Sequence, residues 1–221
     1  MIDVLYILYL LSILVSAVMA VIYRKDLATR KLVILVPFLI IVFFQESTLR
    51  LTEYLDYSFS SAVIYNIYRP VSALVFSWIY YRVPFMSPLK KLIAGLTILY
   101  VFITLINYCF ITSIFFNSSY LTLLRGFLIT FCAILFLFRY FNLDNLKEEK
   151  YWRPLVWITA GIAVFYPVVT LSVTFQDYLD TQDATLFGFK LYRVIPQVIS
   201  IFMYSCFSYA FYLCRKIRWT S

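Results

Sequence analysis

Apolar residues form seven long runs along the chain, separated by short polar segments. Each run is about 20 residues long, which at a helical rise of about 1.5 Å per residue covers the ~30 Å hydrocarbon core of a bilayer. The pattern therefore predicts an all-α polytopic membrane protein with seven transmembrane helices. Because the connections are short, we expect a single transmembrane domain over residues 1–221. The predicted helices cover residues 2–23, 32–52, 61–81, 92–113, 119–141, 154–176 and 189–214.

The composition supports a membrane protein. Hydrophobic residues make up 63% of the 221 residues, charged residues make up 14%, and the mean hydropathy is +0.87. A soluble domain carries roughly a quarter charged residues, so this chain has too few to cover a surface exposed to water. With only four glycines, we expect bulky side chains rather than close glycine contacts to pack the helices.

The residue types exclude most catalytic chemistry. The chain contains no histidine, which excludes a bis-His haem, an HExxH zinc site, and Ser–His or Cys–His nucleophile pairs. The four cysteines lack the C-x-x-C spacing that is typical of metal and redox sites. We therefore expect no enzyme, and we predict no catalytic residue, no metal site and no cofactor.

The formal net charge of +8 is distributed unevenly. Of nineteen Lys and Arg residues, fourteen lie in predicted connections that share one side of the membrane. The opposite connections, around 53–60, 114–118 and 177–188, contain no Lys or Arg. The positive-inside rule then predicts a multi-pass protein of the inner (plasma) membrane with its N-terminus outside and its C-terminus cytoplasmic. The positive charge is interpreted as a topology signal and an attraction to anionic lipids, with no nucleic-acid binding.

Several polar residues fall at one depth inside the predicted helices. By the helical rise, Arg69 and Arg125 lie about 10 Å below the outer surface, with Arg193 and Gln197 near the same level. Glu46, on a helix that runs the other way, reaches a similar depth. A charged side chain that faces lipid at this depth costs about 3 kcal/mol, so we expect these residues to face the bundle interior.

Spacing along the chain extends this polar layer. Glu46, Arg50 and Glu53 are four and three residues apart and share one helical face. Tyr65 and Tyr68 belong to a polar segment that ends at Arg69 and is followed at once by proline. The predicted ligand-binding residues are Glu46, Arg50, Arg69, Arg125, Arg193, Gln197, Tyr65 and Tyr68.

Two interpretations of the layer remain open. In one, Glu46 and Glu53 pair with the arginines across the helices and only stabilise the packing. In the other, the arginines outnumber these glutamates by two, and the surplus guanidinium in an outward-facing cavity binds a carboxylate, a phosphate or a lipid headgroup. The acidic outer segment 177–183 would neutralise the surplus if it folded over the layer.

Short motifs carry a resemblance to a protein family. They are an acidic residue late in the second helix, the element Tyr65-Asn66-x-Tyr68 at the start of the third, and the segment RPLVWI at 153–158. With the Phe-, Tyr-, Ile- and Leu-rich composition, these features resemble a family of small seven-helix inner-membrane proteins of Bacteroidota. The resemblance implies the same fold and a sensory role beside a signalling partner.

The chain departs from the family pattern at two positions. Where the resemblance leads us to expect glutamate on the third and fifth helices, this chain has Ser72 and Arg125. If members of the family bind a cation or protons through those acids, this protein should not.

The sequence therefore predicts a non-enzymatic sensor or receptor that recognises an anionic or amphiphilic ligand in its outer half. It would signal through a membrane or cytoplasmic partner at the cytoplasmic helix ends. One alternative is an oligomeric channel or a membrane-disrupting effector, with a role in defence, in which the arginines line an anion-selective path. A second alternative is a structural or assembly subunit. The sequence leaves the ligand, the partner and the oligomeric state open.

Overall fold

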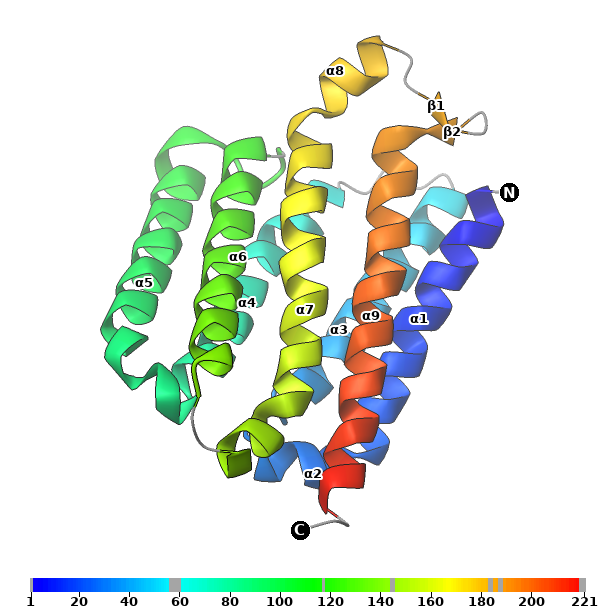
Figure 1. Ribbon diagram of the computed structural model, residues 1–221. Helices are drawn as coiled ribbons and strands as arrows, with labels where there is room; N and C mark the ends of the chain where they lie inside the picture. The colour runs from blue at the N-terminus through cyan, green and yellow to red at the C-terminus, as the bar shows by residue number, and fades with distance from the viewer. Residues whose placement is uncertain are drawn as a thin grey trace.

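The computed structural model is a bundle of long helices (Figure 1). It describes residues 2–55, 61–116, 118–143, 146–182, 185–186 and 189–218. The long helices are α1 (Ile2–Ile22), α3 (Leu35–Tyr54), α4 (Ser61–Tyr81), α5 (Lys90–Ile106), α6 (Ser119–Phe141), α7 (Leu146–Thr174) and α9 (Leu191–Arg218). In this part of the chain, seven helices are long and apolar enough to cross a membrane, which confirms the predicted all-helical, seven-span class.

Short elements connect the long helices. They are α2 (Arg24–Thr29), the 3-10 helix η1 (Pro84–Leu89), the π-helical turn η2 (Asn107–Ile111), α8 (Gln176–Thr181) and the antiparallel strands β1 (Thr185–Leu186) and β2 (Phe189–Lys190). In the hairpin, Thr185 lies opposite Lys190 and Leu186 opposite Phe189. The N-terminus, α8 and the hairpin lie at one end of the bundle, and α2 and the C-terminus lie at the other (Figure 1). We call these the N-terminal end and the C-terminal end.

The predicted boundaries differ from the structure where a helix continues beyond its apolar run. Helix α7 begins at Leu146 rather than near residue 154, and α9 continues to Arg218 rather than ending at 214. Peptide groups gain intrahelical hydrogen bonds whether or not their side chains are apolar, so the hydrophobic pattern underestimates the helix length.

Six of the long helices pack in a ring around a filled interior. The contacts follow the order α1, α3, α4, α6, α7, α9 and back to α1, and α5 packs against α4 and α6 at the edge (Figure 1). Large side chains occupy the interior, and the largest fully buried ones include Phe76, Tyr80, Phe136, Phe207 and Phe211. The bundle is therefore closed by side chains of a size that leaves little free volume between the helices.

Two helix crossings depend on glycine, so our expectation of packing without close glycine contacts is wrong there. A Cβ atom on Gly126 of α6 would overlap the Thr170 side chain of α7. A Cβ on Gly161 of α7 would lie 3.1 Å from the Cys206 Cβ and 3.2 Å from the Met203 backbone of α9. Gly126 and Gly161 therefore lie where neighbouring helices approach closely, whereas Gly95 has open space around its Cβ position.

Candidate functional site: a buried arginine and tyrosine cluster

The structure brings two predicted arginines together inside the bundle. Arg69 lies eight residues into α4 and Arg125 six residues into α6, so the helical rise places both at a similar distance from the N-terminal end. Helices α4 and α6 pack against each other, and both side chains are more than nine tenths buried. The two guanidinium groups are close enough to repel each other electrostatically. The prediction that these residues face the interior agrees with their burial.

Arg69 is anchored through a buried asparagine. Its Nη1 donates to Oδ1 of Asn66. The Asn66 Nδ2 in turn donates to the carbonyl oxygens of Ile114 at 2.6 Å and Phe116 at 2.9 Å. The Tyr108 hydroxyl donates to the Asn66 carbonyl at 3.4 Å. This network joins α4 to the segment that follows α5, and it holds the Arg69 side chain in one orientation.

Arg125 has a different environment, made mostly of aromatic rings. Its guanidinium carbon lies 5.4 Å from the ring centroid of Tyr68 and 5.6 Å from that of Tyr166, which are cation–π distances. Its Nη1 lies 3.5 Å from the Ser72 Oγ, and its buried Nε has no hydrogen-bond partner. The part of the chain that the structure describes records no ion pair for Arg125. We call Arg69, Arg125, Tyr68, Ser72 and Tyr166 the arginine cluster.

Glu46 does not pair with these arginines. The structure records no ion pair between Glu46 and Arg69 or Arg125, so the first interpretation of the polar layer does not hold between Glu46 and these two arginines. The half-buried Glu46 carboxylate of α3 instead lies within hydrogen-bonding reach of the Tyr9 hydroxyl on α1. Tyr68 and Tyr204 are near enough to interact with it electrostatically. Tyr68 therefore lies near both the Glu46 carboxylate and the Arg125 guanidinium.

Among the other predicted site residues, Arg50 packs against α1. The Arg50 guanidinium carbon is 5.0 Å from the Tyr6 ring centroid, and the Tyr6 hydroxyl donates to the Glu46 carbonyl at 3.0 Å. Tyr65 and Gln197 are half-buried on α4 and α9. The side chains of Arg193 and Glu53 lie outside the described part of the structure, as do residue 183 and the side chain of residue 177 in the predicted acidic segment 177–183.

The prediction missed site residues that carry no charge. Ser72, Tyr166 and Tyr9 contact the charged groups, but hydroxyl side chains cost little to place in a membrane helix and give a weak signal. Spacing could have identified Ser72, because Tyr65, Tyr68 and Ser72 are three and four residues apart on one face of α4. Tyr166 and Tyr9 lie on other helices, and only the packing shows their proximity.

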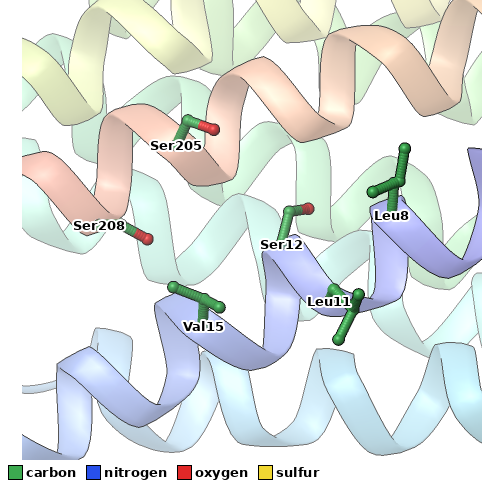
Figure 2. A pocket seen from close by; sticks show the side chains of 6 residues that line it. All are labelled: Leu8, Leu11, Ser12, Val15, Ser205 and Ser208. Atoms are coloured by element: carbon green, nitrogen blue, oxygen red, sulfur yellow. The ribbon is translucent and has the colours of Figure 1, made fainter.

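Two hollows are present beside α1, and neither is lined by the arginine cluster. The first lies between α1 and α9 and has a volume of about 370 Å³ (Figure 2). Its serine hydroxyls already donate to backbone carbonyls: Ser12 to Tyr9, Ser205 to Ile201 and Ser208 to Tyr204. The second hollow, between α1 and α3, has a volume of about 300 Å³ and an apolar lining. Both suit hydrocarbon better than an anion.

The chemistry available in the arginine cluster is recognition of negative charge. Guanidinium groups are permanently protonated, bind carboxylates and phosphates, and act poorly as acids or bases. Within the described residues, the structure contains no group of three or more Cys, Asp or Glu side chains that could hold a metal ion. In comparisons with protein families, curated proteins and solved structures nothing matches this chain, so its resemblance to the Bacteroidota membrane proteins stays a prediction.

Proposed function

We propose that this protein is a receptor-like, non-enzymatic membrane protein that binds an anionic group at Arg125. One observation carries the proposal: Arg125 is 8% exposed, contacts two aromatic rings and one distant hydroxyl, and leaves its Nε unbonded. A buried guanidinium without a carboxylate costs several kcal/mol, and a bound anion would offset that cost. Arg69 adds a second positive charge beside it.

The proposed orientation places the arginine cluster in the outer half of the inner membrane. Its support is the charge distribution: fourteen of the nineteen Lys and Arg residues lie in connections or helix ends on the side of α2 and the C-terminus. An anion from outside the cell would then enter from the N-terminal end. The state of the site would pass to a partner at the C-terminal end.

The packing of the bundle favours a receptor over a pore through one chain. Between the arginine cluster and the C-terminal end, the interior is filled by Phe76, Tyr80, Phe136, Phe207 and Phe211. An ion crossing a single chain would have to displace these side chains, which are packed at the density of a protein core. An oligomeric channel would need a path between copies of the chain. Arg125 could not line that path, because its side chain is buried inside one bundle.

A binding experiment tests the proposed site. Purified protein is titrated with sodium salts of carboxylate, phosphate and halide anions, and in nanodiscs with phosphatidylglycerol, while thermal unfolding is measured. At least one anion should raise the melting temperature by several degrees, because a ligand that binds the folded state stabilises it. Arg125→Gln should remove that increase, whereas Arg50→Gln should retain it, because the Arg50 side chain packs on the Tyr6 ring. If no anion acts, or if the two variants respond equally, the proposed function is wrong.

Thiol labelling tests the proposed orientation, and conductance measurements test whether the protein is a receptor or a channel. In a cysteine-free background, Gln182→Cys at the N-terminal end and Lys25→Cys at the C-terminal end are both at exposed positions. An impermeant thiol reagent should label the first in intact cells and leave the second unlabelled; the reverse result inverts the orientation. Reproducible single-channel currents from the purified protein in planar bilayers would favour the channel alternative instead.

A further inference from the structure

Hydrogen-bond donors without acceptors gather beside the arginine cluster. Besides the Arg125 Nε, the Asn107 Nδ2 and the Tyr100 hydroxyl are buried and have no hydrogen-bond partner. Asn107 is 1% exposed and Tyr100 is 4% exposed. Buried donors in native proteins are nearly always satisfied by protein atoms, water or a ligand. Three of them on neighbouring helices indicate that an acceptor belongs between these helices.

The three donors lie on helices that pack against one another. Tyr100 and Asn107 are seven residues apart on continuous helix, and they therefore share one face of α5 and its π-helical extension. Helix α5 packs against α4 and α6, which carry Arg69 and Arg125. The Tyr100 hydroxyl lies near the Thr104 hydroxyl and interacts electrostatically with both guanidinium groups. Tyr108, next in sequence to Asn107, is within hydrogen-bonding reach of Arg69. Tyr100 and Tyr108 therefore lie near the arginines, and Asn107 shares the helical face of Tyr100.

The surroundings limit the size of the missing acceptor. Arg125, Asn107 and Tyr100 are each less than a tenth exposed, so the acceptor would lie inside the bundle and away from the surface. The Asn107 Oδ1 already accepts from the Thr112 hydroxyl at 2.8 Å, which directs the amide Nδ2 toward other acceptors. An organic acid or a lipid phosphate would need a cavity here, whereas a single atom needs only the separation between donors.

From this arrangement, and resting on the function proposed above, we infer that the ligand is a compact monovalent anion of halide size. It binds between α4, α5 and α6 and accepts hydrogen bonds from the Arg125 Nε, the Asn107 Nδ2 and the Tyr100 hydroxyl. One negative charge between two buried guanidinium groups also relieves their mutual repulsion. Arg69, held by Asn66, supplies charge rather than direct coordination.

The test compares halides with larger anions at constant sodium concentration. Thermal unfolding of the detergent-purified protein is followed while sodium gluconate is replaced by chloride or bromide. Both halides should raise the melting temperature to a plateau, as expected for a site that saturates. Asn107→Leu should weaken the apparent halide affinity about tenfold, the value of one hydrogen bond to a charged group. Tyr100→Phe removes a single oxygen atom, and it provides the same test if Asn107→Leu fails to fold.

Gln45→Leu is the matched control. The Gln45 Nε2 is also buried without a partner, but it lies on α3, which does not pack against α5. This variant should keep the halide response of the wild-type protein. If carboxylates, phosphate or phosphatidylglycerol stabilise the protein through Arg125 and halides do not, the inference is overturned and the proposed function stands. If halides act equally on the α5 variants and the wild type, the location is wrong; if no anion acts, both proposals fail.

Discussion

Two buried arginines at opposite ends of the bundle have different surroundings. Arg30 follows α2 at the C-terminal end and is 5% exposed, and Arg125 is 8% exposed. The Arg30 Nη1 donates to the Tyr151 carbonyl, and its guanidinium carbon lies 4.7 Å from the Tyr151 ring centroid. The Tyr151 hydroxyl donates back to the Thr29 carbonyl at 2.5 Å. Arg125 has its two rings and Ser72, but it lacks a comparable acceptor.

Burial alone therefore does not identify a binding site in this protein. The Arg30 guanidinium has its hydrogen-bond acceptor on α7. It therefore joins α2 to the end of the bundle and has a structural role. Arg125 is equally buried and has a donor left over. A donor without an acceptor is costly in a protein interior, and the anion that we propose as the ligand would supply the acceptor.

The largest expected effect separates these two arginines. Arg30→Gln should lower the free energy of unfolding by about 3 kcal/mol, because it removes a charge-assisted hydrogen bond and a cation–π contact. Arg125→Gln, in gluconate without halide, should change it by less than about 1 kcal/mol, since the lost contacts are offset by removal of an uncompensated charge. Denaturation in mixed micelles measures both. Equal losses would show that Arg125 is as structural as Arg30.

The next largest effect concerns the helix crossing beside Arg125. Gly126→Ala should lower the free energy of unfolding by about 2 kcal/mol, because the added methyl group overlaps Thr170 and forces α6 away from α7. Gly95→Ala is the control, since a Cβ there meets nothing within 4 Å, and alanine favours a helix. Thr170→Ala should restore part of the loss. A Gly126→Ala variant as stable as Gly95→Ala would mean that the crossing is looser than described.

A smaller effect tests which partner Glu46 uses. Double-mutant cycles should give a coupling of about 1.5 kcal/mol between Glu46→Gln and Tyr9→Phe, the value of a hydrogen bond to a charged group. Coupling between Glu46→Gln and Arg125→Gln should stay below about 0.5 kcal/mol, because no ion pair joins them. The same unfolding assay supplies both values. A larger coupling to Arg125 than to Tyr9 would restore Glu46 as a counter-ion of the arginine cluster.

The smallest effect concerns the structural end of the molecule. Lys31 has a φ of 61°, in the left-handed region, directly after the turn that ends α2. Lys31→Gly should raise the free energy of unfolding by about 0.5 kcal/mol, because glycine adopts this conformation without steric cost. The halide response should not change, since Lys31 is at the end opposite the arginine cluster. Loss of stability would indicate that the Lys31 side chain contributes more than its backbone strain costs.

The all-helical fold class and the level of Arg69 and Arg125 along their helices could be predicted from the sequence alone. Predicted helices 61–81 and 119–141 coincide with α4 and α6, because their ends are marked by polar connections. The helical rise then placed Arg69 and Arg125 at a common level. These properties depend only on local pattern and chain length, and no knowledge of neighbouring helices is needed to read them.

Which side chains meet at that level depends on the tertiary structure. Glu46 shares the depth of the arginines, yet it approaches Tyr9, and Arg50 stacks on Tyr6 instead of joining the cluster. The orphan donors Asn107 and Tyr100 became visible only through the packing of α5. Depth follows from distance along one helix, whereas contact depends on how each helix is rotated about its axis. That rotation is set by the packing of all the neighbours together.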